Sequence, residues 1–442
     1  MPAALPALSA LDAAREIRER RLTCLDYTRT LLQRIDQREP EVQAWEHLVR
    51  EQVLDAARAI DEAIARNDAS GPLLGVPVAI KDIIDVRGMP TGDGTVLHAG
   101  RIAGDDAALV RALRRAGAWP IGKSVTTELA TYAAGKTRNP RNIAHTPGGS
   151  SSGSAASVAC GMVPLAIGTQ TNGSMIRPAS FCGVVGYKPS FGRIARGGVL
   201  RQSPTLDQIG VFARNVDDAA TLAEALFGPD PSDPATVQAP TPPLAAIAAQ
   251  DPPTPLRLAW TRTPWWDRVA ADAQAAFDGW VQQLDDAIET IELPAEAQQA
   301  IAWLRTIMEA DIATSYEREY DTGRAQLSES LQQQIERGRA ITAVDYRKAI
   351  ENRARVTAAI DPLFARFDAI ACPATLGTAP AASDGTGDPL MCTLWTYIGS
   401  PAISLPLLEG ANGLPLGVQL VGRHGDDARL LRTARALMRA GR

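Results

Sequence analysis

A lysine at the end of an apolar run and two turns rich in serine and glycine are the residues best suited to chemistry in this sequence. Lys81 directly follows the apolar residues 76–80, and the two turns span residues 148–154 and 168–174. A serine hydroxyl needs a positioned base to become a good nucleophile, and lysine is a base only when it is neutral. Burial away from carboxylates favours neutral lysine. The residues alone leave another interpretation open, in which Lys81 pairs with Asp82 at the surface and the turns are flexible loops.

Three familiar motifs also occur, and the context of each argues against it. Residues 117–124 match the phosphate-loop pattern, but a helix is expected before them and Pro120 removes a backbone donor. Residues 78–81 match the strand lysine of protein kinases, yet the glycine-rich loop, His-Arg-Asp and Asp-Phe-Gly motifs are missing. Residues 149–153 match the nucleophile elbow of serine hydrolases, which requires a preceding strand and a later histidine. The preceding segment is not strand-like, and the only later histidine is His424.

Composition narrows the class of protein. The chain of 442 residues has a net charge of −5 and a sequence pI near 5.6, which argues against a polyanion-binding surface. Its five cysteines are scattered and odd in number, which suits a reducing compartment. Its four histidines form no H-x-x-x-H pair, so a zinc hydrolase lacks its usual ligands. With no basic residue before Leu8 and no long apolar stretch, we expect a cytoplasmic protein without a metal, a cofactor or membrane contact.

Apolar spacing predicts one α/β domain with a large mixed β-sheet covered by helices on both faces. Helical periodicity begins after Ser9, a candidate helix cap, and short apolar runs alternate with helical stretches from Leu73 onwards. Strands recur near the end of the chain, so residues 1–442 are expected to form a single domain. Its expected parts are N-terminal helices (9–70), a strand–helix core (73–226), a Pro-rich surface excursion (227–256), a helical cover (266–366), and C-terminal strands with a final helix (369–442).

Both serine turns belong to longer segments with a recognisable pattern. The first reads Gly-Gly-Ser-Ser-Ser-Gly-Ser-Ala-Ala (148–156), and the second reads Gly-Thr-Gln-Thr-Asn-Gly-Ser (168–174). They closely resemble the amidase signature family, and the likeness extends from about residue 9 to residue 440. Further segments that share it are 75–82, 181–189 and 414–419.

The resemblance implies a Ser-cisSer-Lys catalytic triad of Lys81, Ser150 and Ser174, with a cis peptide bond before Ser150. In the implied mechanism, Ser174 attacks an amide carbonyl and forms an acyl-enzyme. Ser150 passes the Ser174 proton to neutral Lys81 and later returns it to the leaving amine. Water then hydrolyses the acyl-enzyme.

The resemblance also implies how the oxyanion is held. The backbone N–H groups of Thr171, Asn172, Gly173 and Ser174 would form the oxyanion hole, because such donors must be aimed in advance at the developing charge. Ser152 and Thr169 are expected to brace the serine turns by hydrogen bonds.

Three positions depart from the common family pattern. Asn172 stands where most members have glycine, and Gln170 replaces the common aspartate. Asparagine tolerates unusual backbone angles better than most residues, so we expect the turn of residues 171–174, called the oxyanion turn below, to form. Arg177 stands three residues after the nucleophile, a variant that is similar to malonamidase-type and carboxybiuret-hydrolase-type members with carboxylate-bearing substrates. Arg177 either binds a substrate anion or structures the turn.

The sequence thus predicts an amidohydrolase of linear amides. Its partners would be a small amide substrate and water, without nucleic acid, and a homodimer is left open. The substrate could be an aliphatic amide, a carboxylate-bearing half-amide, an aryl amide, a carbamate or a urea derivative, in a pocket lined by Trp395. One alternative is a subunit of a tRNA-dependent amidotransferase. The net charge of −5 and the lack of a long C-terminal extension argue against it. The other is a pseudoenzyme scaffold.

Overall fold

The computed structural model describes residues 7–441, and its centre is one mixed sheet of 11 strands. The strand order is β1-β3-β2-β4-β6-β5-β10-β11-β9-β7-β8, so strands from both ends of the chain lie in the same sheet. This confirms the predicted α/β fold with a large mixed sheet. The strands are β1 (Trp45–His47), β2 (Pro77–Lys81), β3 (Trp119–Ser124), β4 (Leu165–Gln170), β5 (Val185–Lys188), β6 (Gln208–Ala213), β7 (Leu258–Trp260), β8 (Ile288–Thr290), β9 (Ala369–Pro373), β10 (Ala402–Glu409) and β11 (Pro415–Val421).

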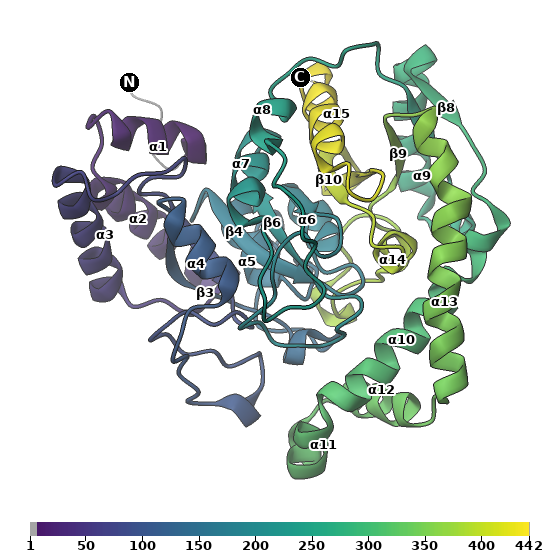
Figure 1. Ribbon diagram of the computed structural model, residues 1–442, viewed down its shortest axis with the longest axis horizontal. Helices are drawn as coiled ribbons and strands as arrows, with labels where there is room; N and C mark the ends of the chain where they lie inside the picture. Colours follow the sequence, from purple (N-terminus) through teal and green to yellow (C-terminus); the bar gives the residue numbers. More distant parts are fainter. Residues whose placement is uncertain (1–6, 442) are drawn as a thin grey trace.

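Helices cover both faces of this sheet (Figure 1). Alternate residues of a strand point to opposite faces, and β2 shows this directly. Val78 and Ile80 belong to the apolar core on one face, whereas Ala79 belongs to the core on the other. The helices are α1 (Ala10–Arg18), α2 (Cys24–Val42), α3 (Arg50–Ala65), α4 (Ala108–Arg115), α5 (Ser152–Ala159), α6 (Ile176–Cys182), α7 (Val216–Leu226), α8 (Leu244–Ala248), α9 (Ala271–Leu284), α10 (Ala300–Ser315), α11 (Glu317–Gly323), α12 (Glu329–Arg339), α13 (Ala343–Ile360), α14 (Leu390–Tyr397) and α15 (Asp427–Ala440).

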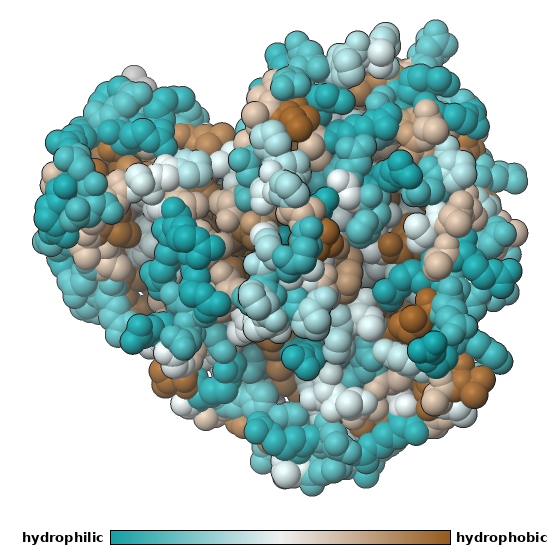
Figure 2. Space-filling model, in the orientation of Figure 1, coloured by the Kyte–Doolittle hydropathy of each residue, from teal (hydrophilic) through white to brown (hydrophobic). Residues whose placement is uncertain are grey.

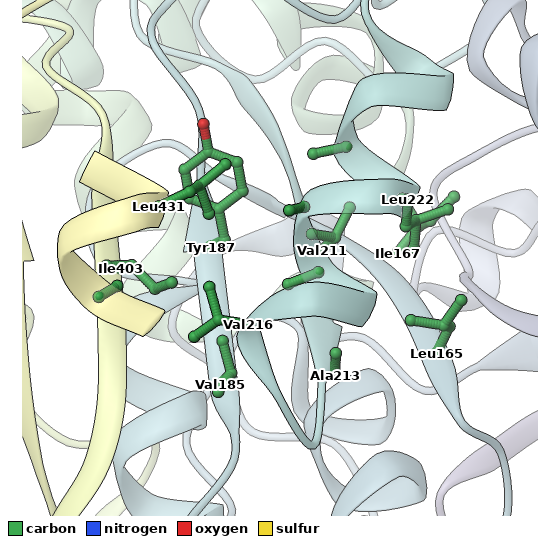
Figure 3. Close-up of a cluster of buried hydrophobic side chains, with 14 of the residues drawn as sticks. Leu165, Ile167, Val185, Tyr187, Val211, Ala213, Val216, Leu222, Ile403 and Leu431 are labelled. Carbon is green, nitrogen blue, oxygen red and sulfur yellow. The ribbon is translucent and has the colours of Figure 1, made fainter. Parts of the chain in front are cut away.

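The core on the first face is built from branched and aromatic side chains of neighbouring strands (Figure 3). Ile167 of β4 and Val211 of β6 lie beside Leu222 of α7, and Tyr187 of β5 lies beside Leu431 of α15. Each fully buried side chain of this size contributes about 1.5–3 kcal/mol relative to an exposed one. This core holds β2 and β4 rigidly, and these two strands carry the site described below.

The N-terminal helices differ in one detail from the expected pattern. Ser9 caps α1 as expected, and its hydroxyl accepts the N–H of Asp12 at 3.0 Å. The expected helical stretch from residue 9 to 70 is interrupted, however, by strand β1, which pairs antiparallel with β3. Because β1 has only three residues, Trp45–His47, it is too short to show a period of two in the sequence.

A cluster of helices from the second half of the chain lies at the opposite end of the molecule from α1–α3 (Figure 1). Helices α10, α12 and α13 pack together and against α14 and β9 through a second apolar core. Two loops of the first half hold this cluster: His98 contacts Glu319 of α11, and the Glu128 carboxylate accepts hydrogen bonds from Ser328, the cap of α12. The cluster is therefore fixed beside the loops that follow β2 and β3.

The Pro-rich segment 227–256 runs along the surface and includes α8, which packs against α7 and α15. The face in Figure 2 is predominantly hydrophilic, with hydrophobic residues in small scattered groups. None of the helices within residues 7–441 is both long and apolar enough to cross a membrane. Within the same residues, no group of three or more His, Cys, Asp or Glu side chains is arranged to hold a metal ion.

Candidate active site

Lys81 owes its position to the end of strand β2. Strand β2 lies between β3 and β4 and runs parallel to both. The carboxyl ends of parallel strands meet at the same edge of a sheet, which is where α/β proteins commonly bind ligands. Lys81 closes β2 at this edge, and Thr169 and Gln170 close β4 beside it.

The Lys81 side chain is completely buried and is bonded to two hydroxyl groups. Its Nζ donates to Ser150 Oγ and to Thr169 Oγ1, each at 2.7 Å. Burial lowers the pKa of Lys81 well below its usual range, and only the negative charge of Asp207 acts in the other direction. A lysine held by neutral groups in this way is prepared to be the neutral base.

Asp82 does not pair with Lys81 at the surface. Its carboxylate forms an ion pair with Lys123 at 2.9 Å, and both side chains are buried. Lys123 is the lysine of the literal phosphate-loop match, but it lies inside strand β3 rather than in a loop. The structure therefore excludes the surface-pair interpretation of Lys81 and the phosphate-loop interpretation of residues 117–124.

Ser150 approaches Lys81 from the tight turn that precedes α5. The Gly149–Ser150 peptide bond is cis, as the family resemblance implies. Arg177 Nη2 donates to the carbonyl of Gly149 at 2.7 Å, which fixes the turn from the side of α6. A Cβ atom on Gly149 would lie 2.7 Å from the side chain of Thr386, so no larger residue fits here without a shift.

Ser174 lies in the turn between β4 and α6. Its side chain is 9% exposed, whereas Ser150 is 1% exposed, so Ser174 is the more accessible of the two hydroxyls. Within residues 7–441, the backbone N–H groups of residues 171–174 make no hydrogen bond. Four consecutive free donors beside an accessible hydroxyl are the arrangement that an oxyanion hole requires.

Gln170 holds the turn that presents these donors. Its Oε1 accepts the N–H groups of Met175 and Ile176 at 2.8 and 3.1 Å, and its Nε2 donates to Thr396 Oγ1 at 2.9 Å. Thr396 in turn donates to the carbonyl of Asn172. A carboxamide can accept and donate at once, which the aspartate common in the family cannot do when ionised. Gln170 thus connects the start of α6 to the oxyanion turn through α14.

Replacing Gln170 with glutamate is expected to lower kcat by about 10- to 100-fold. Glutamate keeps the acceptor for Met175 and Ile176 but loses the donor to Thr396 and buries a charge, a defect that costs about 1–3 kcal/mol. Steady-state kinetics on an amide substrate measure the effect, and Gln37→Glu, at an exposed position, is the matched control. A wild-type kcat for Gln170→Glu would show that the turn does not depend on this side chain.

The departure at Asn172 is accommodated without unusual backbone angles. Within residues 7–441, neither Asn172 nor the adjacent Gly173 has a positive φ, so the turn does not need glycine for conformational reasons. The Asn172 Oδ1 accepts from Thr393 at 2.8 Å, and its Nδ2 lies 3.4 Å from the hydroxyl of Tyr132. Its side chain thereby becomes part of a cavity wall.

This cavity has a volume of about 450 Å³, is lined by Tyr132, and reaches the oxyanion turn at Asn172. Its other walls come from α10, α12 and α14, so the helical cluster shapes the space next to the turn. Two ion pairs lie in the lining: Arg268 with Asp388 at 2.8 Å, and Arg337 with Glu309 at 2.7 Å. The cavity therefore offers both signs of charge to a molecule bound at the turn.

Comparison with known proteins identifies the family. A family model described as amidase matches residues 26–431. The chain belongs to the amidase family. A glutamyl-tRNA(Gln) amidotransferase subunit from Carboxydothermus hydrogenoformans is 32% identical to this amidase, over 97% of this chain and 96% of the relative.

Solved structures agree with this assignment. An inhibitor-bound structure, from work on a vestigial protein complex and the evolutionary origins of an s-triazine catabolic enzyme, is 28% identical. Its TM-score is 0.92, and the match covers 98% of this chain and 99% of that chain. The peptide amidase of Stenotrophomonas maltophilia is also 28% identical, with a TM-score of 0.85, and the match covers 98% of this chain and 97% of that chain. The protein is thus an enzyme of amide C–N bond chemistry.

The curated relatives correct two sequence-based expectations. We predicted a hydrolase of small amides that has no nucleic-acid partner, but the relatives matched over nearly their whole length are amidotransferase subunits named for a tRNA. The prediction was wrong because serine–lysine chemistry does not distinguish hydrolysis from transfer. The net charge was also a poor guide, because a sum over the whole surface says nothing of contacts that another protein chain makes.

The remaining candidate residues of this amidase occupy different surroundings. Ser152, the first residue of α5, donates to the carbonyl of Val125 at 3.2 Å. Besides its contact with Gly149, Arg177 donates to Thr386 at 3.2 Å, and its Nε and Nη1 are buried without a partner within residues 7–441. Trp395 is 1% exposed in the core of the helical cluster and does not line the cavity at Asn172.

Sequence reasoning missed two residues that contact the oxyanion turn. Tyr132 lies against Asn172, and Asp207 accepts a hydrogen bond from the hydroxyl of Thr171 at 2.7 Å. Neither belongs to a serine turn or follows an apolar run, so nothing in the local pattern marked them. An ionisable residue in a loop does not indicate a functional role until its hydrogen-bond partner is known.

Proposed function

We propose that this amidase is the amide-cleaving subunit of a tRNA-dependent amidotransferase, like the relatives that it matches over nearly their whole length. It takes ammonia from a linear amide donor, and partner subunits use that ammonia to amidate the amino acid on a tRNA. The observation that carries the catalytic part is the 2.7 Å contact between Lys81 Nζ and Ser150 Oγ in a fully buried site.

In this proposal, Ser174 attacks the amide carbon of the donor. Ser150 takes the Ser174 proton and passes its own to neutral Lys81 along the 2.7 Å contact. The N–H groups of residues 171–174 stabilise the oxyanion. When the intermediate collapses, the proton returns through Ser150 to the departing nitrogen, which leaves as ammonia. Water then attacks the Ser174 ester by the same relay and releases the donor's acid.

The cavity supports a donor that carries both charges. A free amino acid has an ammonium and a carboxylate, and the lining pairs Arg268 with Asp388 and Arg337 with Glu309. Each pair presents a cation and an anion that a zwitterion can contact with opposite ends. Glutamine fits this description, because its amide stands at the far end of the side chain from both charges.

The acceptor tRNA is bound mainly by the partner subunits in this proposal. Such an assembly works in the cytoplasm, and the five cysteines, all free and buried, are compatible with a reducing compartment.

The assembled enzyme tests this function. The chain is combined with the amidotransferase subunits of its own source organism, and amidated tRNA is measured with glutamine or with ammonium chloride as the nitrogen source. We expect wild type to use both sources. The Ser174→Ala assembly is expected to use only ammonium chloride, because the partner's transfer step does not need the serine.

The controls separate the two halves of the proposal. Ammonia release from glutamine, compared with release from a neutral aryl amide and a carbamate, reports amide cleavage without transfer. Release without any amidated tRNA in the full assembly would contradict the amidotransferase function. Glutamine-dependent amidation that persists in Ser174→Ala would contradict the assignment of the nucleophile.

A further inference from the structure

A second cavity, of about 210 Å³, borders the active site on the side of Thr169 and Thr171. Its wall includes Asp207, a partly buried carboxylate in the loop between Ser203 and β6. The mechanism above makes no use of this carboxylate. Within residues 7–441, its charge is nevertheless the only one that shifts the pKa of Lys81.

Both oxygens of Asp207 are fixed by hydrogen bonds. Oδ2 accepts the N–H groups of Gln202 and Ser203, each at 2.9 Å. Oδ1 accepts the hydroxyl of Thr171 at 2.7 Å, and the Gln202 Oε1 lies 3.0 Å from the same hydroxyl. One hydroxyl proton serves one acceptor, and the shorter contact with the charged group takes it. Asp207 thus holds the first residue of the oxyanion turn by its side chain.

The same carboxylate counteracts the effect of burial on the pKa of Lys81. Thr171 is two residues from Thr169, whose hydroxyl contacts Lys81 Nζ at 2.7 Å. A negative charge here favours the protonated lysine, whereas burial favours the neutral one. The balance between the two determines how much of the base is available at a given pH.

We propose that Asp207 is a positioning residue for the amide-cleaving reaction: its carboxylate, held by Gln202 and Ser203, fixes the oxyanion turn through the Thr171 hydroxyl and places a negative charge in the cavity wall that Thr169 also lines. This inference rests on the proposed function of the Lys81–Ser150–Ser174 triad. Asp207 touches neither the substrate nor the reacting atoms, so it acts through the other residues.

Asp207 faces a small set of charged and titratable groups. Arg196 approaches from the preceding loop, where its guanidinium pairs with Asp233 and contacts the carbonyl of Asp207 at 3.2 Å. Tyr316 lies on the side of the helical cluster, and Lys81 lies at the end of β2. The charge of Asp207 raises the pKa of both groups. Burial raises the pKa of Asp207 to about 6, so its carboxylate is ionised at pH 7 and its charge is lost as the pH falls below that value.

The sign of the expected effect follows from these charges. Activity needs neutral Lys81, so kcat/KM rises with pH through the pKa of this lysine. Asp207→Asn removes the charge that favours protonated Lys81, so this acidic limb should move to lower pH by about one unit. The loosened oxyanion turn should also lower kcat at the optimum by about 10- to 100-fold.

Ammonia release from glutamine by the full assembly, measured across pH, tests the inference. Thr171→Val removes the hydroxyl but keeps the charge, so it should lower kcat and leave the limb in place. Asp207→Glu should keep the limb near its wild-type position, and Asp207→Ser replaces the asparagine variant if that variant does not fold. A wild-type kcat for Asp207→Asn at the pH optimum, or an acidic limb that stays in place without the Asp207 charge, would overturn the inference. Wild-type protein that releases no ammonia would instead contradict the proposed function.

Discussion

Ser174→Ala is expected to lower kcat for amide cleavage by about 10⁴- to 10⁶-fold. Removal of the nucleophile from a serine hydrolase abolishes the acyl-enzyme route and leaves only the stabilisation supplied by the oxyanion hole and binding. Here the free N–H groups of residues 171–174 remain in place, so the residual rate reports their contribution together with that of substrate binding. The same variant should not form the acyl adduct that mass spectrometry detects in wild type treated with a slowly turned-over substrate.

Two measurements guard this result against misfolding and contamination. Ser383→Ala removes an exposed hydroxyl bonded only to its neighbour Asp384, and it should retain wild-type kcat. The thermal melting of Ser174→Ala should match wild type, because Ser174 is 9% exposed and lies in a turn outside the apolar cores. Turnover of the alanine variant at the wild-type rate would place the chemistry elsewhere.

Lys81→Met is expected to combine a large loss of activity with a gain in stability. Without the base, the relay from Ser174 through Ser150 has no terminus, and kcat should fall by about 10⁴-fold. The linkage between proton binding and folding gives the stability effect. Unfolded Lys81 is protonated at pH 7 and the buried lysine is driven towards its neutral form, so folding releases a proton and is disfavoured below the usual lysine pKa.

The free energy of unfolding of Lys81→Met should therefore exceed that of wild type at pH 7, and the difference should shrink as the pH rises towards about 10.4. Lys123→Met is the matched comparison, because this lysine is equally buried but pairs with Asp82 at 2.9 Å. Removing it leaves an uncompensated buried charge, which costs about 3–5 kcal/mol. Denaturant unfolding at several pH values measures both variants. A Lys81→Met protein destabilised like Lys123→Met would show that Lys81 is charged and paired in the folded state.

The fold was largely predictable because strand and helix periods are local properties. The run before Lys81 and the run 118–121 correspond to β2 and β3, and the cap at Ser9 is the cap of α1. Short strands were missed where no period can develop, as in β1 with three residues and in β8 within the helical cover. Strand β1 pairs with β3, which is far along the chain. Strand β8 pairs with β7, which precedes the predicted helical cover.

Function was harder to predict than fold. The serine turns indicate the amidase family, but they report only the chemistry that all its members share. The choice of donor and acceptor depends on the cavity made by α10, α12 and α14, whose residues follow no motif. The amidotransferase relatives therefore overturned an expectation based on net charge, a quantity that does not describe a binding surface.

The sequence by itself determined which groups are the candidates for the chemistry, because Lys81, Ser150 and Ser174 stand in long patterned segments. Only the tertiary structure decided the state of those groups. The pKa of Lys81 depends on burial and on the charge of Asp207, and its two hydroxyl partners come from distant segments of the chain. Likewise, the carboxylate beside Lys81 in the sequence, Asp82, pairs with Lys123 of the next strand instead. Charge and solvation depend on distance in space, so a local pattern names a catalytic residue without revealing its protonation or its partners.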